Sequence, residues 1–205
     1  MGPAEETNFV SVDDYLSAEE MAVTRSEYID GWVRAMSGST IRHNRVTLNC
    51  TSSLLAKLRA KPCQPHNSDT KLRIRRHTNS RFYYPDAQVV CDSNPATSVF
   101  QDNPVLIIEV LSPSTRAYDL DEKLTAYLTI PSLQCYVILE QHTPFAIVMR
   151  RTATGFLREA CEGTESTIDL PFIGCELSLC DIYEGVEFTA TCVQESEPEY
   201  ELTSD

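Results

Sequence analysis

Two acids and a lysine between residues 86 and 123 have the types and spacing that metal-assisted hydrolysis requires. Asp86 follows a proline within an apolar run, Glu109 interrupts the apolar run 105–111, and Lys123 follows in the next helical pattern. A divalent cation held by carboxylate oxygens polarises a phosphoryl oxygen and lowers the pKa of a bound water, and a nearby lysine stabilises the developing charge or orients the water. We therefore predict Mg²⁺, or Mn²⁺ in its place, on Asp86 and Glu109, with Lys123 as the third catalytic residue.

Both Glu109 and Lys123 also have structural interpretations. An ionised glutamate inside a strand covered on both faces is costly unless it is paired, hydrogen-bonded or bound to a cation, and an arginine at the strand end would also satisfy Glu109. Lys123 would otherwise be an exposed helix lysine that pairs with Asp119 four residues earlier. Many α/β proteins contain two acids and a lysine, so the spacing alone does not decide between these interpretations.

The predicted elements around these residues form a strand–helix–strand unit. Residues 105–111 and 135–139 read as buried strands, and residues 119–128 as a helix with Asp119 as its N-cap. This order predicts a parallel crossover. The strand predicted over residues 82–91 contains Pro85, which places Asp86 where the backbone bends.

Three further residues are predicted to support the site. Glu27 lies on a β-hairpin over residues 26–36 that turns at Asp30-Gly31, and it faces either the site or water. His43 lies in the first turn of an amphipathic helix over residues 41–61, where it reaches a phosphate or caps the helix. Gln88, two residues after Asp86, either contacts the site or is an amide at the edge of the core.

The remaining patterns predict supporting structure. Residues 69–75 alternate as a basic, edge-like strand. Residues 145–149 and 156–158 pair as a hairpin across Thr154-Gly155, and residues 174–188 close the domain. We expect a flexible N-terminus over residues 1–10, one domain over residues 11–190 and an acidic disordered tail over residues 191–205.

Composition limits the class of protein. The chain has 205 residues, a net charge of −13 and no apolar run near the roughly 20 residues of a membrane span. Its first residues lack the pattern of a signal peptide, so we predict a cytoplasmic protein without membrane contact. The eight cysteines contain no Cys-x-x-Cys pair, which favours buried reduced thiols over zinc ligands or disulfides.

The charge is unevenly distributed along the chain. Residues 25–81 contain twelve Lys or Arg and three acids, whereas the acids concentrate elsewhere. This basic segment is compatible with phosphate binding; the alternative is a solvated charged face.

Several short motifs together resemble the Uma-type restriction endonuclease family, a former domain of unknown function within the PD-(D/E)XK nuclease superfamily. The motifs are Glu27–Gly31, Met36–Ser39 with His43-Asn44, Tyr84-Pro85-Asp86, Glu109–Thr115, Asp119 with Glu122-Lys123 and Tyr127, and Pro131–Leu133 with Tyr136.

The resemblance implies a restriction-endonuclease-like α/β (α+β) fold, in which helices flank a central mixed sheet and β-hairpins are added at both ends of the chain. It also implies a Mg²⁺ site at Asp86 and Glu109 that includes the Val110 carbonyl, a DNA substrate and a homodimer. The superfamily pattern has a lysine two residues after the glutamate, where this chain has Leu111. Lys123 is the expected replacement.

Three functions follow from these observations. The first is a Mg²⁺-dependent endonuclease that hydrolyses DNA phosphodiester bonds. The second is a catalytically inactive nuclease fold that binds nucleic acid or protein, which the missing lysine and the acidic net charge favour. The third is a metal-dependent hydrolase of a smaller phosphoester.

Overall fold

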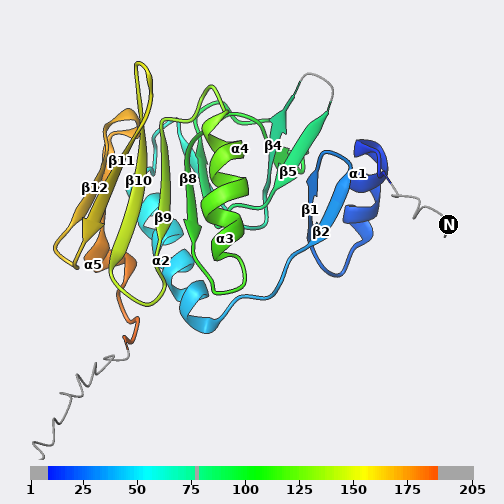
Figure 1. Cartoon of the computed structure of the whole chain (residues 1–205). Helices are drawn as coiled ribbons and strands as arrows, with labels where there is room; N and C mark the ends of the chain where they lie inside the picture. Colours follow the sequence, from blue (N-terminus) through cyan, green and yellow to red (C-terminus); the bar gives the residue numbers. More distant parts are fainter. Residues whose placement is uncertain (1–8, 77–78, 189–205) are drawn as a thin grey trace, which may run out of the picture.

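The computed structural model of the chain describes residues 9–76 and 79–188, and within them two sheets lie side by side with helices against their faces (Figure 1). The six-stranded sheet has the order β11-β10-β9-β8-β6-β3 and the five-stranded sheet the order β2-β1-β5-β4-β7. Residues 1–8 and the predicted tail over residues 191–205 lie outside the described residues.

The six-stranded sheet and a separate pair form one half of the molecule. Their strands are β3 (Gln64–Asn67), β6 (Ala87–Val90), β8 (Pro104–Val110), β9 (Cys135–Leu139), β10 (Phe145–Thr152) and β11 (Gly155–Glu162), with β12 (Thr167–Leu170) and β13 (Cys175–Ser178) as the pair. β8 and β9 run parallel and the other pairs antiparallel, so the predicted mixed sheet and parallel crossover are confirmed.

The five-stranded sheet contains β1 (Ser26–Ile29), β2 (Trp32–Ala35), β4 (Lys71–Arg75), β5 (Ser80–Tyr83) and β7 (Phe100–Gln101). β1 and β2 form the predicted hairpin, in which Asp30 and Gly31 have positive φ angles of 49° and 101°. The prediction that β4 is an edge strand is wrong, because it lies between β5 and β7.

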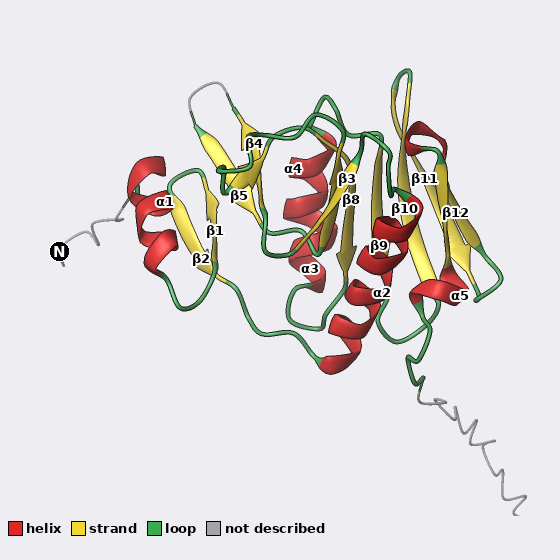
Figure 2. Ribbon diagram, turned by 180° about the vertical axis from the view of Figure 1, so that it is seen from behind, coloured by secondary structure: helices red, strands yellow, loops and turns green. Residues whose placement is uncertain are grey.

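Within residues 9–76 and 79–188, seven helical segments complete the fold. They are α1 (Val12–Met21), α2 (Ile41–Lys57), α3 (Arg116–Tyr118), the π-helix η1 (Asp119–Lys123), α4 (Leu124–Leu128), the 3₁₀-helix η2 (Pro171–Ile173) and α5 (Leu179–Ile182). α2 lies on one face of the six-stranded sheet and α3 to α4 on the other (Figures 1 and 2).

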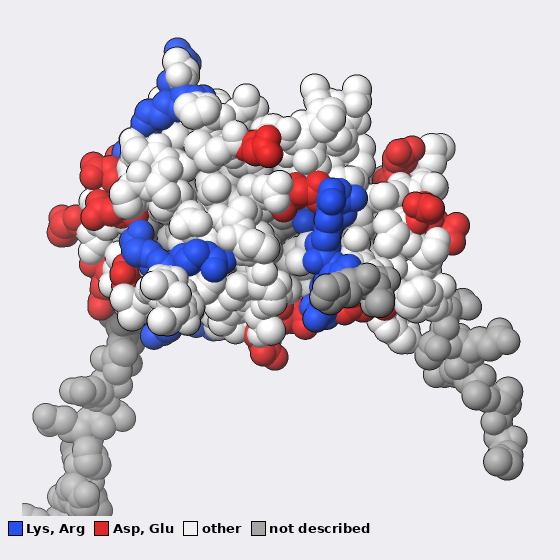
Figure 3. Space-filling model, turned by 90° about the horizontal axis from the view of Figure 1, so that it is seen from above, with Lys and Arg blue, Asp and Glu red and all other residues white. Residues whose placement is uncertain are grey.

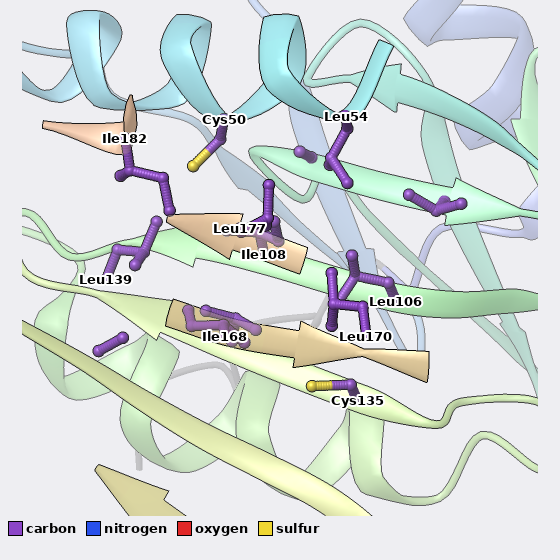
Figure 4. Close-up of a cluster of buried hydrophobic side chains, with 14 of the residues drawn as sticks. Cys50, Leu54, Leu106, Ile108, Cys135, Leu139, Ile168, Leu170, Leu177 and Ile182 are labelled. Carbon is purple, nitrogen blue, oxygen red and sulfur yellow. The ribbon is translucent and has the colours of Figure 1, made fainter. Parts of the chain in front are cut away.

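Side chains of β8 alternate between these two faces. Leu106, Ile108 and Val110 pack with α2, β12, β13 and α5, as Figure 4 shows for Leu106 and Ile108. Ile107 and Leu111 pack with α4 on the opposite face. Since side chains along a strand alternate, Glu109 faces α4 as well.

Two predicted helix boundaries are wrong. α2 ends at Lys57, before the predicted residue 61, and a turn connects it to β3. Asp119 is not an N-cap, because helical turns already begin at Arg116 after Thr115. Asp119 instead starts η1, a helical form that is rare and is frequent at functional sites.

The predicted strand over residues 82–91 is two strands. β5 belongs to the five-stranded sheet and β6 to the six-stranded sheet, and the chain passes between them through Tyr84, Pro85 and Asp86. Asp86 therefore lies at the predicted bend.

The cysteine prediction is wrong for one pair. Cys63, just after α2, and Cys91, at the end of β6, form a disulfide. Cys50 and Cys135 are buried free thiols, as predicted. Separately, the described helices include none with the length and hydrophobicity of a membrane span.

Candidate active site

A pocket of about 250 Å³ opens where α2 begins, at the end of β8. Five of the six residues predicted to be catalytic or supporting line this pocket, together with Val110; these are Glu27, His43, Asp86, Glu109 and Lys123. The structure does not bring Gln88 to the pocket lining, because its amide Nε2 donates to the Thr70 carbonyl at 2.9 Å. The pocket therefore joins residues from both sheets and from two helices.

Lys123 lies at the centre of three buried carboxylates. Its Nζ is 2.9 Å from Glu109 Oε1, 3.2 Å from Glu27 Oε1 and 3.5 Å from Asp119 Oδ1. Lys123 is 5% exposed, so the interpretation as an exposed helix lysine is wrong, although the pair with Asp119 is present. The hydroxyl of Tyr127 also donates to Glu109 Oε1 at 2.8 Å.

The missing lysine at position 111 has a packing explanation. Leu111 is 2% exposed and belongs to the apolar cluster between β8 and the helix that covers it. Glu109 faces the same helix, and Lys123 at the end of η1 reaches it from there. An ammonium group thus approaches Glu109 from the covering helix rather than from the strand.

Burial and charge crowding set the ionisation of this cluster. Burial alone lowers the pKa of Lys123, but the carboxylates of Glu109 and Glu27 outweigh it and raise that pKa well above its usual value. Burial raises the pKa of Glu109, and the charge of Asp86 adds to the rise while Lys123 opposes it. Lys123 therefore stays protonated, and the pocket contains more carboxylates than its one lysine neutralises.

Asp86 is held by the backbone of β8 and by the first turn of α2. Its Oδ2 accepts a hydrogen bond from the Val110 amide at 2.8 Å and lies 3.2 Å from His43 Nε2. Burial alone lowers the pKa of His43, but the hydrogen bond and charge of Asp86, together with the Val110 backbone and the charge of Asp119, outweigh it and raise that pKa. The predicted capping role belongs to Thr40, whose hydroxyl accepts from the His43 amide at 3.1 Å.

The donor chemistry of the pocket fits a divalent cation. Asp86 and Glu109 offer carboxylate oxygens beside the Val110 backbone, the ligand type that Mg²⁺ and Mn²⁺ prefer. The buried Oδ1 of Asp119 has no hydrogen-bond partner, and its ion pair with Lys123 is long at 3.5 Å. Over residues 9–76 and 79–188, no group of three His, Cys, Asp or Glu side chains is arranged to hold a metal ion.

Two charged residues of the pocket were not predicted from the sequence as site residues. Arg34 on β2 lines it, with the guanidinium carbon 3.7 Å from the centre of the Tyr118 ring. Asp119 lines it too, although it was assigned to capping. The spacing of four between Asp119 and Lys123 was a usable signal, whereas the position of Arg34 depends on how the hairpin docks.

Half of the cations in the basic segment over residues 25–81 already form ion pairs within the protein. Six of its twelve cations pair with carboxylates; they are Arg25, Lys57, Arg73, Arg75, Arg76 and Arg81. On the face seen in Figure 3, basic side chains form separate patches interspersed with acids. The segment is therefore not one basic surface, and only part of it lies near the pocket.

The family model described as "Putative restriction endonuclease", Uma2, matches residues 12–181. The chain belongs to this family. Two relatives come from Synechocystis sp. (strain ATCC 27184 / PCC 6803 / Kazusa). Uncharacterized protein slr1290 is 30% identical over 181 residues, covering 87% of this chain and 94% of the relative. Uncharacterized protein sll1609 is 33% identical over 138 residues, covering 66% of this chain and 77% of the relative.

A solved structure supports the fold of this Uma2-family chain. A putative nuclease belonging to DUF820 from Anabaena variabilis ATCC 29413 matches with a TM-score of 0.69 and 16% sequence identity, covering 85% of this chain and 98% of that one. At this identity the likeness establishes the fold, and the predicted restriction-endonuclease-like class is confirmed.

Proposed function

We propose that this protein is a Mg²⁺-dependent endonuclease that hydrolyses DNA phosphodiester bonds, with Mn²⁺ as a substitute cation. The observation that carries the proposal is Lys123, whose ammonium group contacts Glu109 in a pocket that also contains Asp86. Membership of a family described as restriction endonucleases supports nucleic acid as the substrate.

Asp86, Glu109 and the Val110 carbonyl would hold the cation. When bound, it would supply Lewis acidity toward a phosphoryl oxygen and a more acidic water. The chain keeps these ligands in place, since the Val110 amide and His43 hold Asp86 while Lys123 and Tyr127 hold Glu109.

Lys123 would also act on the substrate. It remains protonated, and two of its contacts, to Glu109 and Glu27, are shorter than the third, to Asp119 at 3.5 Å. The N–H group on the Asp119 side is the one available to a phosphoryl oxygen or to the attacking water. Arg34 at the pocket wall supplies a second positive charge for the substrate.

A plasmid-nicking assay with Mg²⁺ or Mn²⁺ tests the proposal. We expect Asp86→Asn and Glu109→Gln each to lower the cleavage rate by at least about 100-fold, because each removes a charged ligand of the cation. Asp121→Asn is the matched control, since this exposed acid lies two residues from Lys123. Full activity in both site variants, with unchanged melting temperatures, would refute the proposal.

The proposal includes a homodimer in the cytoplasm. The edge strand β2 exposes Trp32 by 59% and Val33 by 46%, which offers an apolar surface to a second copy. Sedimentation equilibrium of the wild type and of Trp32→Ser measures this association; a monomer at all concentrations removes the dimer from the proposal and leaves the hydrolysis untouched.

A further inference from the structure

A second hollow lies beside the pocket at the start of α2. We call it the arginine groove; its walls include Thr40, Arg42, Arg45, Pro113, Gln141 and Glu187. In Figure 1 the start of α2 and the described end of the chain lie near each other at the lower edge of the molecule.

The pocket and the arginine groove share their dividing wall. Ser39 and His43 line the pocket, while Thr40 between them lines the groove. Likewise Ser112 lines the pocket and Pro113, the next residue, lines the groove. A ligand that extends beyond the pocket in this direction therefore enters the groove.

The groove presents cations that the fold does not neutralise. Over the described residues, Arg42 and Arg45 form no ion pair with a carboxylate, unlike six other cations of the basic segment. Arg42 contacts only an imidazole, with its Nη1 2.7 Å from His142 Nδ1.

The helix end adds to this positive charge. The first turn of α2 contains no acid, and a cation there is unfavourable beside the positive end of the helix dipole unless an anion binds. Several amide groups of a first helical turn also lack acceptors within the helix.

The groove also contains a buried side chain, Gln141, whose amide nitrogen has no hydrogen-bond acceptor. Gln141 is 2% exposed, and its Oε1 accepts a hydrogen bond from the Thr40 hydroxyl at 2.9 Å. Its Nε2 is buried without an acceptor. A buried donor without an acceptor costs about 1–3 kcal/mol, so the site lacks a ligand atom that accepts a hydrogen bond.

We propose that the arginine groove binds a phosphate of the nucleic-acid strand next to the phosphate that is hydrolysed in the pocket. Arg42 and Arg45 neutralise this flanking phosphate, and Gln141 Nε2 donates to one of its oxygens. The inference rests on the proposed function for its substrate and adds a residue set outside the catalytic pocket.

Another anion of this chain could compete for the groove. Residues 185–187 line it, and the sequence after residue 193 contains five acids. Nucleic acid is favoured because the wall between the groove and the pocket is shared, so that one strand reaches both.

Binding of a labelled DNA duplex to the full chain in EDTA tests the proposal without cleavage. The slope of log K against log salt concentration changes by about 0.9 for each phosphate contact. We therefore expect Arg42→Gln with Arg45→Gln to make the slope shallower by about 0.9, because the two arginines neutralise one phosphate. Arg59→Gln, an exposed arginine just after the same helix, should leave affinity nearly unchanged.

Gln141→Glu is the second variant, because it keeps the acceptor for Thr40 and replaces the amide donor with a negative charge. We expect at least tenfold weaker binding, measured at a temperature at which circular dichroism shows the variant to be folded. Unchanged binding in both the arginine and the glutamine variants overturns the proposal, and so does a wild type that fails to bind the duplex. Tighter binding by the arginine variant also overturns it, and identifies the acidic residues after 193 as the occupant.

The test of the groove can be read independently of the test of the proposed function. Asp86→Asn changes no groove residue, so its salt slope should equal that of the wild type whether or not cleavage is lost. If Asp86→Asn still cleaves, the proposed catalytic site fails while the slopes continue to test the groove.

Discussion

At the level of single residues, Lys123 is the cation that contacts the buried carboxylates of the pocket. It is the one cation in direct contact with Glu27, Glu109 and Asp119, all of which are nearly inaccessible to water. Removing one partner from a buried ion cluster destabilises a protein far more than replacing the whole cluster with apolar side chains, because the remaining charges stay desolvated. The residue proposed to act in hydrolysis thus also stabilises the fold.

Lys123→Met should lower the free energy of unfolding by about 3–5 kcal/mol, because three carboxylates lose their cation. Adding Glu109→Gln should restore part of this loss, since one of the uncompensated charges disappears. Urea unfolding measures both variants, and Lys57→Met, whose ion pair with Asp181 is partly exposed at 4.0 Å, should cost no more than about 1 kcal/mol. Additive effects of Lys123→Met and Glu109→Gln would contradict the described coupling.

Single residues also show what a sequence can predict of a site. Asp86 and Glu109 were identifiable because a carboxylate within an apolar run requires an explanation. Arg34 was not, since an arginine on a short hairpin is ordinary until the hairpin docks beside α3. Gln88 was assigned from alternation with Asp86, but Asp86 precedes the strand, so alternation does not relate the two.

At the level of elements, the helix after β8 differs most from the structure that its sequence pattern predicts. Residues 119–128 have helical periodicity, yet the turn from Asp119 to Lys123 is a π-helix. Hydrophobic periodicity does not distinguish an α-turn from a π-turn, and N-cap preferences made Asp119 a plausible start. The boundaries of β8 and β9 lie within one residue of their apolar patterns, because burial on both faces determines them. The hairpin strands β10 (Phe145–Thr152) and β11 (Gly155–Glu162) are longer than predicted, because their pairing continues through polar residues.

A second element contact depends on Asp102, which joins β4 to the segment after β7. Its carboxylate accepts hydrogen bonds from Arg73 at 2.6 and 2.8 Å and from Arg75 at 3.0 Å. Burial alone raises the pKa of Asp102, but the hydrogen bonds and charge of Arg73 outweigh it and lower that pKa. The stabilisation is therefore complete above the unfolded-state pKa of about 3.9 and is lost as pH falls through the lower folded-state pKa.

Asp102→Asn should lower the free energy of unfolding at pH 7 by about 2 kcal/mol, because two arginines lose their carboxylate. The difference from the wild type should shrink as the pH falls below about 4. Urea unfolding at pH 7 and pH 3 measures it, with the exposed Asp92→Asn as control. A difference that is the same at both pH values would rule out this charge contact.

At the level of the whole molecule, a covalent link joins the neighbouring strands β3 and β6 at one edge of the six-stranded sheet. The disulfide between Cys63 and Cys91 closes a loop with a sequence separation of 28. It escaped prediction because cysteine spacing does not reveal which residues meet in space. Disulfides persist mainly in oxidising compartments, and the cytoplasmic location stays a prediction.

Cys63→Ser with Cys91→Ser should lower the free energy of unfolding by about 3–4 kcal/mol, the loop-entropy value for a closure of this length. The wild type in excess reductant should lose a similar amount, and Cys180→Ser, an exposed free thiol, should lose little. Peptide mapping of the oxidised protein gives the direct check. Free thiols at both positions would show that the link does not form.

The β1–β2 hairpin has a consequence for shorter versions of this fold. A chain that began at residue 37 would retain the six-stranded sheet, α2 and the Asp86–Glu109 pair. It would lose Glu27 and Arg34, so that water would replace one anionic and one cationic side chain of the pocket. The N-terminal segment thus supplies charged side chains to the pocket, and its removal would also uncover Phe82, which packs against Tyr15 and Tyr28.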